Sequence, residues 1–129
     1  MAFSGPLTVL YVDDDADIRR IVELSVSLDP EIDLRIAASG PEALEMIAQS
    51  KWRPDVVLLD VMMPRMNGVA VMRALREDHG LTDTPFIFIT AMGRQADISG
   101  YRALDVAGII LKPFDPITLA KRIREMVEP

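Results

Sequence analysis

Four short and nearly unbroken apolar runs constrain the fold of this chain more than any other feature of its sequence. They occupy residues 7–12, 56–59, 86–89 and 109–111 and are rich in β-branched side chains. A strand with one solvated face alternates apolar and polar residues, whereas a strand covered on both faces is apolar throughout. The four runs therefore predict buried parallel strands. A fifth segment, residues 33–38, alternates in the way that is typical of an edge strand.

Between these runs the apolar residues are spaced by three or four positions, which predicts amphipathic helices. Pro41 and Pro116 stand where the first turn of a helix tolerates a missing N–H, so they mark the starts of the second and last helices. The fourth helix, residues 95–106, has the weakest pattern because Gly100 interrupts it. The apolar positions of the other helices are Ile18, Ile21, Val22 and Leu28, then Ala43, Leu44, Ile47 and Ala48, then Val69, Met72 and Leu75, and finally Ile117, Ala120, Ile123 and Val127.

Five strands alternating with five helices predict an α/β fold. The expected architecture is a (βα)5, doubly wound, five-stranded parallel sheet with helices on both faces and the flavodoxin-like strand order 2-1-3-4-5. A length of 129 residues fits one domain. Because the last predicted helix reaches Pro129, we expect residues 1–129 to be a single domain with no effector domain.

Charge and composition exclude several classes of function. Fourteen Lys and Arg residues against twenty Asp and Glu residues give a net charge of −6, and there is no basic cluster to neutralise nucleic-acid phosphates. The chain has no cysteine, which excludes disulfides and thiolate metal sites. No apolar run approaches the roughly 20 residues of a membrane span. We therefore expect a cytoplasmic protein that binds no nucleic acid and does not insert into a membrane.

Polar residues follow the predicted strands at the points where the strands end. Asp13 and Asp14 follow the first strand, Asp60 the third, Thr90 the fourth and Lys112 the fifth. In an open sheet of parallel strands, ligands bind at the edge where the carboxyl ends of the strands meet. We therefore expect three carboxylates, one hydroxyl and one ammonium to share one site.

Three carboxylates at one site require a cation. Two carboxylates held about 4 Å apart repel by roughly 4 kcal/mol at an effective dielectric constant near 20. Oxygen ligands without histidine or cysteine favour Mg²⁺, and we expect Mg²⁺ to stabilise the fold. Asp60 can then act as a nucleophile, because carboxylates form acyl phosphates. Lys112 would balance the added charge, and the Thr90 hydroxyl would hydrogen-bond a phosphoryl oxygen.

Together with its flanking motifs, this set of residues resembles the receiver domain of two-component response regulators over essentially the whole chain. Each motif is short, but the five occur in the right order and each stands at the end of a predicted strand. The matching pieces are Val-Asp-Asp at 12–14, Asp-Val-Val-Leu-Leu-Asp at 55–60, Met-Pro-Arg-Met-Asn-Gly at 63–68, Thr-Ala at 90–91 and Lys-Pro-Phe at 112–114.

The resemblance implies a phosphorylation-dependent signalling switch rather than an enzyme in the ordinary sense. Asp60 would accept a phosphoryl group from the phosphohistidine of a histidine kinase or histidine phosphotransfer protein, and a downstream output protein would read the resulting change. Asp13, Asp14 and Asp60 would hold Mg²⁺ together with the backbone carbonyl of Met62. In this family the peptide bond after the lysine that corresponds to Lys112 is often cis.

Three other interpretations stay open at this point. A Mg²⁺-dependent phosphatase of the haloacid-dehalogenase type also has an aspartate nucleophile after its first strand, and Asp13 and Asp15 match its Asp-x-Asp pattern. Such a phosphatase would turn over a phosphomonoester repeatedly. A flavodoxin-like cofactor binder needs a phosphate-cradling loop, which the acidic run after the first strand does not offer. A receiver-like module that acts without phosphorylation usually lacks the acceptor or the lysine, and this chain has both.

Three positions suggest how the signal is transmitted and how long it lasts. Ile109 stands where the family usually has an aromatic residue, and its short β-branched side chain cannot make the same large swing. We therefore expect the loop after Thr90 and the helix at 95–106 to carry the output. Met62 and Met92 stand at positions where, in this family, polar residues tend to accompany fast self-dephosphorylation. A thioether is only a weak hydrogen-bond acceptor and has no donor with which to orient a water molecule. We therefore expect a long-lived phosphoryl group.

The charged residues after the first strand have simpler expected roles. Asp15 and Asp17 are expected to cap the first helix, because acidic side chains accept hydrogen bonds from its free N–H groups. Arg19 and Arg20 are expected to lie on a solvated face of that helix.

Overall fold

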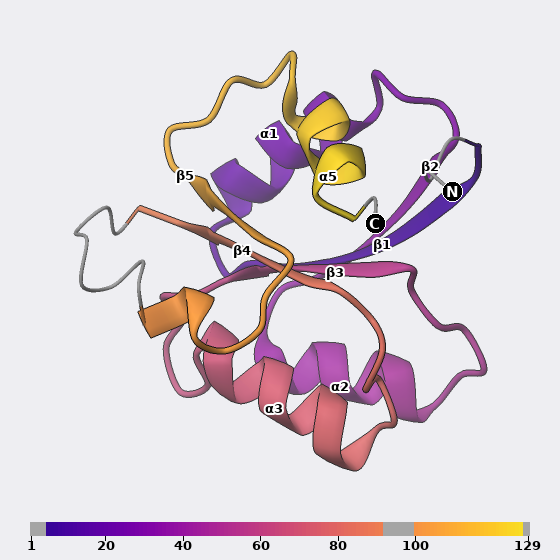
Figure 1. Ribbon diagram of the computed structural model, residues 1–129, viewed down its shortest axis with the longest axis vertical. Helices are drawn as coiled ribbons and strands as arrows, with labels where there is room; N and C mark the ends of the chain where they lie inside the picture. The colour runs from indigo at the N-terminus through magenta and orange to yellow at the C-terminus, as the bar shows by residue number, and fades with distance from the viewer. Residues whose placement is uncertain (1–4, 92–99, 128–129) are drawn as a thin grey trace.

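The computed structural model describes residues 5–91 and 100–127, and its centre is one parallel sheet (Figure 1). Within these ranges five strands pair in the order β2-β1-β3-β4-β5, and every pairing is parallel. This confirms the predicted fold class and strand order, with strand ends that differ by at most one residue from those predicted. The strands are β1 (Leu7–Val12), β2 (Ile32–Ala37), β3 (Val56–Asp60), β4 (Phe86–Thr90) and β5 (Gly108–Leu111).

Helices cover both faces of the sheet, as predicted. In Figure 1, α1 (Ala16–Val26) and α5 (Leu119–Val127) lie on one face, and α2 (Gly40–Ala48) and α3 (Gly68–Asp78) lie on the other. Residues 100–102 are also helical and lie on the side of α3. In the part of the chain that the structure describes, no helix combines the length and the apolar character needed to cross a membrane.

Side-chain caps explain where three of these helices begin. The Asp15 carboxylate accepts hydrogen bonds from the backbone N–H groups of Asp17 and Ile18 at 2.9 and 3.2 Å. This confirms Asp15 as a cap of α1, with Asp17 in the first turn. The side chains of Ser39 and Asn67 cap α2 and α3 in the same way. Each such cap stabilises a helix by about 1 kcal/mol.

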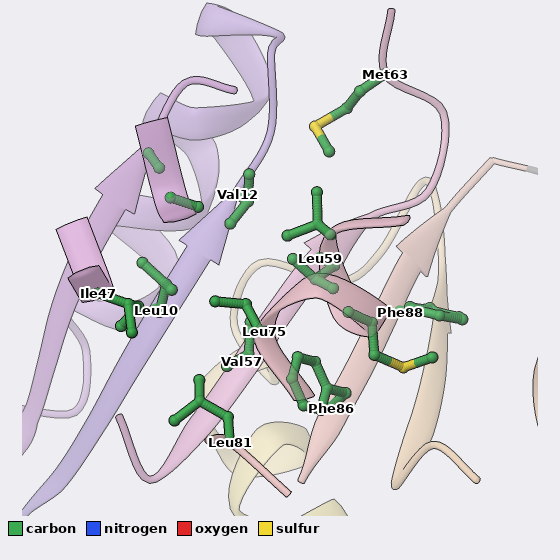
Figure 2. Packing of buried hydrophobic residues seen from close by; sticks show 14 of the residues in the cluster. Leu10, Val12, Ile47, Val57, Leu59, Met63, Leu75, Leu81, Phe86 and Phe88 are labelled. Carbon is green, nitrogen blue, oxygen red and sulfur yellow. The ribbon is translucent and has the colours of Figure 1, made fainter. Parts of the chain in front are cut away.

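Alternation along the strands divides the core into two apolar clusters, one on each face of the sheet. On β1, Leu10 and Val12 pack toward α2 and α3, whereas Val9 and Tyr11 pack toward α1 and α5. Figure 2 shows the cluster on the side of α2 and α3. Because burying one large apolar side chain contributes about 1.5–3 kcal/mol, the two clusters hold the sheet firmly between its two helix layers.

The last helix begins later than predicted. It starts at Leu119 instead of Pro116, and residues 116–118 form a turn. The Asp115 carboxylate accepts a hydrogen bond from the N–H of Ile117 at 2.9 Å, and such local side-chain bonds compete with helix formation. Ile117 is 78% exposed, so the prediction that it shares the buried face of this helix is wrong.

The buried face of α1 also differs from the predicted one. Val22, Ser25 and Val26 are buried, whereas Ile21 and Leu28 are 40% and 62% exposed. Ser25 tolerates burial because its hydroxyl donates to the backbone carbonyl of Ile21 at 2.7 Å. Apolar spacing alone could not identify this face, because a polar residue with a satisfied hydroxyl occupies one of its positions.

The predicted helix at 95–106 is described only in part, because residues 95–99 lie outside the described ranges. Its last helical residue is 102, and Asp105 adopts a left-handed backbone conformation with a φ of 61°. Arg76 of α3 donates to the backbone carbonyls of Leu104 and Asp105 at 3.0 and 2.9 Å. The helix therefore ends earlier than predicted, and α3 holds the turn that follows it.

An ion pair ties α5 to the loop after α1. Nε of Arg124 lies 2.5 Å from Oδ2 of Asp29, and Nη2 donates to the backbone carbonyl of Gly5 at 2.7 Å. The hydrogen bond from Arg124 lowers the pKa of Asp29 below its usual value. The ionised carboxylate is therefore more stable in the folded chain than in the unfolded chain.

Replacing Asp29 with Asn should lower the free energy of unfolding by about 1–2 kcal/mol at neutral pH, because a charge-assisted hydrogen bond is lost. Since the folded-state pKa is lowered, this stabilisation is present above the unfolded pKa of about 4 and is lost as the pH falls below it. Urea unfolding of the two proteins between neutral and acidic pH measures the difference. A difference that does not shrink on acidification would contradict this account.

Candidate functional site

Strand alternation brings three charged side chains to the same side of one sheet edge. Asp13 follows β1, Asp60 ends β3 and Lys112 follows β5. Each stands two residues after a side chain that packs toward α1 and α5, and residues at this spacing share a face of the sheet. The carboxyl ends of three different strands thus supply one group of charges.

Lys112 lies between two of the carboxylates. Its Nζ is 3.4 Å from Oδ2 of Asp13 and 3.3 Å from Oδ1 of Asp60. Asp13 is fully buried, and Asp60 is 4% exposed. Two buried carboxylates therefore share one ammonium group, which leaves this set with an excess of negative charge.

Asp14 adds a third carboxylate at the surface. One oxygen from each of Asp13, Asp14 and Asp60 lies within 4.8 Å of the other two, and Asp14 is exposed. We refer to these three residues and Lys112 as the acidic pocket. Three carboxylates without nitrogen or sulfur ligands suit Mg²⁺, which binds one or two carboxylates and keeps several waters. The residues present therefore fit the predicted cofactor.

Burial changes the acidity of Asp60. The removal of its carboxyl group from water is the main reason that the pKa of Asp60 rises to about 6, and the negative charge of Asp13 raises it further. Lys112 acts in the opposite direction through its charge and its hydrogen bond. At neutral pH the Asp60 carboxylate is mostly ionised, as a nucleophile must be, but this charge destabilises the folded chain.

Thr90 reaches the same sheet edge on β4. It is the last residue of that strand and is fully buried. Its carbonyl accepts a hydrogen bond from the N–H of Lys112 at 2.8 Å. Asp60 pairs with Ile89 in the register of β3 and β4. Thr90, the next residue on β4, therefore lies beside the acidic pocket. The peptide bond between Lys112 and Pro113 is cis, as the sequence resemblance implied.

Two methionines are expected to control the lifetime of the phosphoryl group, and one of them lies within the residues that the structure describes. Met62 stands two residues after Asp60, and its side chain is 61% exposed. It can therefore be replaced without opening the core. Met92, the other position, lies outside the described residues.

Two contacts to Asp13 were not predicted from the sequence. The Tyr11 hydroxyl donates to Oδ2 of Asp13 at 2.5 Å, and Arg19 donates to the backbone carbonyl of Asp13 at 2.9 Å. Arg19 is half-buried, so the prediction that it lies on a solvated face is wrong, whereas Arg20 is exposed as expected. The contact from Tyr11 has a signal in the sequence, because a residue two positions before Asp13 shares its face of the strand.

Comparison with known proteins agrees with this geometry. The family model of the response regulator receiver domain matches residues 9–124. This chain belongs to the response regulator receiver family. Such receivers are signalling domains rather than classical enzymes. Membership therefore favours a signalling domain over the phosphatase and the flavodoxin-like cofactor binder that the sequence left open.

The relatives of this receiver include longer regulators. It is 40% identical over 119 residues to the probable transcriptional regulator ycf27 of Guillardia theta, and the match covers 92% of this chain and 44% of that protein. It is 37% identical over 117 residues to the DNA-binding response regulator MtrA of Mycolicibacterium paratuberculosis, covering 90% of this chain and 49% of that protein. The receiver thus spans less than half the length of these two relatives.

Solved receiver structures share the whole fold. The chemotaxis response regulator CheY4 of Vibrio cholerae superposes with a TM-score of 0.81 at 34% identity, covering 95% of this chain and 99% of that chain. The receiver domain of the Francisella response regulator 1452 has a TM-score of 0.80 at 26% identity, covering 94% of this chain and 96% of that chain. These matches confirm the resemblance that the sequence motifs indicated.

Proposed function

We propose that this receiver is a phosphorylation-dependent switch whose acceptor is Asp60. The phosphoryl group comes from the phosphohistidine of a histidine kinase or histidine phosphotransfer protein. Asp13, Asp14 and Asp60 hold Mg²⁺, together with the backbone carbonyl of Met62. The observation that carries the proposal is the position of Lys112, whose Nζ lies 3.4 and 3.3 Å from the carboxylates of Asp13 and Asp60 at the end of the sheet.

In the transfer step, a carboxylate oxygen of Asp60 forms a new bond to phosphorus while the P–N bond of the phosphohistidine breaks. The electron pair of that P–N bond stays on the imidazole nitrogen of the donor. Lys112 supplies a positive charge beside the acceptor, where negative charge accumulates on the phosphoryl oxygens. Bound Mg²⁺ supplies further neutralisation of the phosphoryl oxygens. Because Asp60 is only 4% exposed, few water molecules have to leave its carboxylate before it bonds to phosphorus.

The signal follows from a shift between two conformations. The hydroxyl of Thr90 hydrogen-bonds a phosphoryl oxygen on Asp60, and the chain after β4 rearranges to follow it. A downstream output protein binds one of the two conformations better and so reads the phosphorylation state. Thr90 suits this role because it ends the strand next to that of the acceptor.

The proposed function is tested by incubating the protein with Mg²⁺ and acetyl phosphate and measuring the intact mass. Wild-type protein should gain one phosphoryl group, and Asp60→Asn should gain none. Asp83→Asn is a matched control, because Asp83 is an exposed carboxylate in the loop before β4, at the opposite end of the strands. Phosphoryl uptake by Asp60→Asn, or no uptake by wild type, would overturn the proposed acceptor.

Met62→Asn should shorten the lifetime of the phosphorylated protein by up to about tenfold, which corresponds to about 1.4 kcal/mol of activation free energy. An amide can orient the attacking water by hydrogen bonds, whereas a thioether has no donor. The decay of phosphorylated protein after removal of acetyl phosphate gives the rate. Met62→Leu keeps an apolar side chain of similar size and should leave the rate unchanged. Equal decay in wild type and Met62→Asn would show that this side chain does not set the lifetime.

The output route stays a prediction that amide exchange can test. Ile109 is half-buried and packs in the cluster on the side of α2 and α3, together with Tyr101 and Leu104. Addition of a beryllofluoride mimic of the phosphoryl group should change exchange in the chain that follows Thr90 and around Tyr101. A change confined to the strand at Ile109 would contradict an output through that segment.

A further inference from the structure

Tyr11 places a phenol inside the acidic pocket, and the proposed function gives it no part. Its side chain is fully buried in β1, and its hydroxyl donates to Oδ2 of Asp13 at 2.5 Å. A tyrosine hydroxyl, with an ordinary pKa of about 10, is neutral at pH 7. It can therefore donate a hydrogen bond to a carboxylate without adding charge.

The contacts of Asp13 show what this hydrogen bond does. Oδ2 accepts from the Tyr11 hydroxyl at 2.5 Å and lies 3.4 Å from Nζ of Lys112. Oδ1 accepts from the backbone N–H of Asp15 at 2.9 Å. Two of these hydrogen bonds go to Oδ2 and one goes to Oδ1. Because each carboxylate oxygen has two lone pairs, Oδ1 is the less occupied oxygen of Asp13 and the better placed of the two to bind a cation.

Among the side chains that contact Asp13, Tyr11 is the one best suited to fix its orientation. A tyrosine has two side-chain torsions and this ring is enclosed by the core on the side of α1 and α5, whereas lysine has a long flexible stem. Lys112 also divides its contacts between Asp13 and Asp60 at similar distances. A short hydrogen bond from a rigid donor is therefore well placed to fix the orientation of the Asp13 carboxylate.

We propose that Tyr11 is a positioning residue for metal binding. Its hydroxyl holds the carboxylate of Asp13 so that Oδ1 is presented to Mg²⁺, while Oδ2 stays with Lys112 in reach of Asp60. The inference rests on the proposed function, because it requires that the acidic pocket binds Mg²⁺. Groups that orient a metal ligand in this way typically change metal affinity by 10–100-fold when they are removed.

Tyr11→Phe removes the hydroxyl and keeps the ring, so it isolates this contact. Mg²⁺ binding is measured by calorimetric titration, and phosphorylation by acetyl phosphate is measured over a range of Mg²⁺ concentrations. We expect a dissociation constant for Mg²⁺ about tenfold higher than in wild type. The Mg²⁺ concentration for half-maximal phosphorylation should rise by the same factor, with a smaller change in the rate at saturating Mg²⁺. A merely structural role would lower the melting temperature without moving the dissociation constant.

Thr8→Val is the matched control. Thr8 lies at the other end of β1, and its hydroxyl also donates to a carboxylate, that of Asp55, at 3.0 Å. Its replacement removes one hydroxyl from the same strand away from the acidic pocket. The dissociation constant for Mg²⁺ should stay at the wild-type value in this variant.

The outcomes separate this inference from the proposed function. If wild type neither binds Mg²⁺ nor takes up a phosphoryl group, the proposed function fails. If wild type does both and Tyr11→Phe binds Mg²⁺ with the wild-type dissociation constant, the inference about Tyr11 is overturned. If Tyr11→Phe does not fold, the ring resonances of Tyr11 are followed in labelled wild-type protein. Mg²⁺ should shift them through Asp13, and unchanged resonances at saturating Mg²⁺ would overturn the inference.

Discussion

Replacing Asp60 with Asn should make the protein more stable at neutral pH in the absence of Mg²⁺, by about 1–3 kcal/mol. The carboxylate of Asp60 is buried and faces that of Asp13 across a single ammonium group. Asn has nearly the same shape and no charge, so the variant relieves the repulsion and the desolvation of the acceptor. The residue proposed to carry the chemistry is thus expected to reduce stability.

The pH dependence gives this prediction a sign that can be checked. Burial, and then the charge of Asp13, raise the pKa of Asp60 to about 6 in the folded chain, against about 4 when unfolded. Between these values the folded chain holds a proton that the unfolded chain has released. Stability therefore falls as the pH rises from about 4 to about 6, and the loss is complete above that range.

Urea unfolding of wild type and Asp60→Asn from acidic to neutral pH, in the presence of a chelator, measures this effect. The two proteins should have similar stability at a pH of about 4, where Asp60 is protonated, and should diverge as the pH rises. Mg²⁺ should then stabilise wild type more than the variant, because the variant has lost one carboxylate ligand. Equal stability of the two proteins at neutral pH would show that the charge of Asp60 does not destabilise the fold.

Gly68→Ala should destabilise the protein by about 1–3 kcal/mol or more and slow phosphorylation of Asp60. Gly68 begins α3, and its N–H donates to the carbonyl of Val61 at 3.0 Å. A Cβ at this position would lie 2.5 Å from the backbone oxygen of Asp60 and 3.0 Å from Cα of Val61. These are backbone atoms and cannot rotate away. The end of β3 or the start of α3 must therefore shift, and the acceptor would move with it.

Gly100→Ala is the control for the replacement of a helical glycine by alanine. Gly100 is exposed, and an added Cβ would meet no atom within 4 Å. This change should stabilise the protein by about 0.5–1 kcal/mol, because alanine has less backbone entropy to lose. Urea unfolding and the rate of mass gain with acetyl phosphate compare both variants with wild type. If Gly68→Ala were as stable and as reactive as wild type, the close approach of α3 to Asp60 would have no consequence.

The sequence alone predicted the sheet and most of the acidic pocket, and the physical reason is the same for both. A strand buried on both faces has to be apolar throughout, so the runs at 7–12, 56–59 and 86–89 could be recognised without knowledge of their neighbours. Parallel strands end at one edge, so the first polar residues after these runs had to meet. The proximity of Asp13 and Asp60 follows from this rule. Lys112 joins them from the end of β5, an edge strand in which Ile110 is the buried residue, so the prediction that the run at 109–111 is a buried strand is wrong.

Tertiary packing determined several features that the local pattern of apolar and polar residues does not specify. The outward position of Ile117 depends on an Asp115 hydrogen bond, and the buried face of α1 includes Ser25 because its hydroxyl finds a carbonyl. The raised pKa of Asp60 and the hydrogen bond from Tyr11 to Asp13 depend on burial and on distances of a few ångströms. Periodicity shows which residues share a face of one strand or helix. Only the packing of several elements determines which polar groups lose their water and which partners replace it.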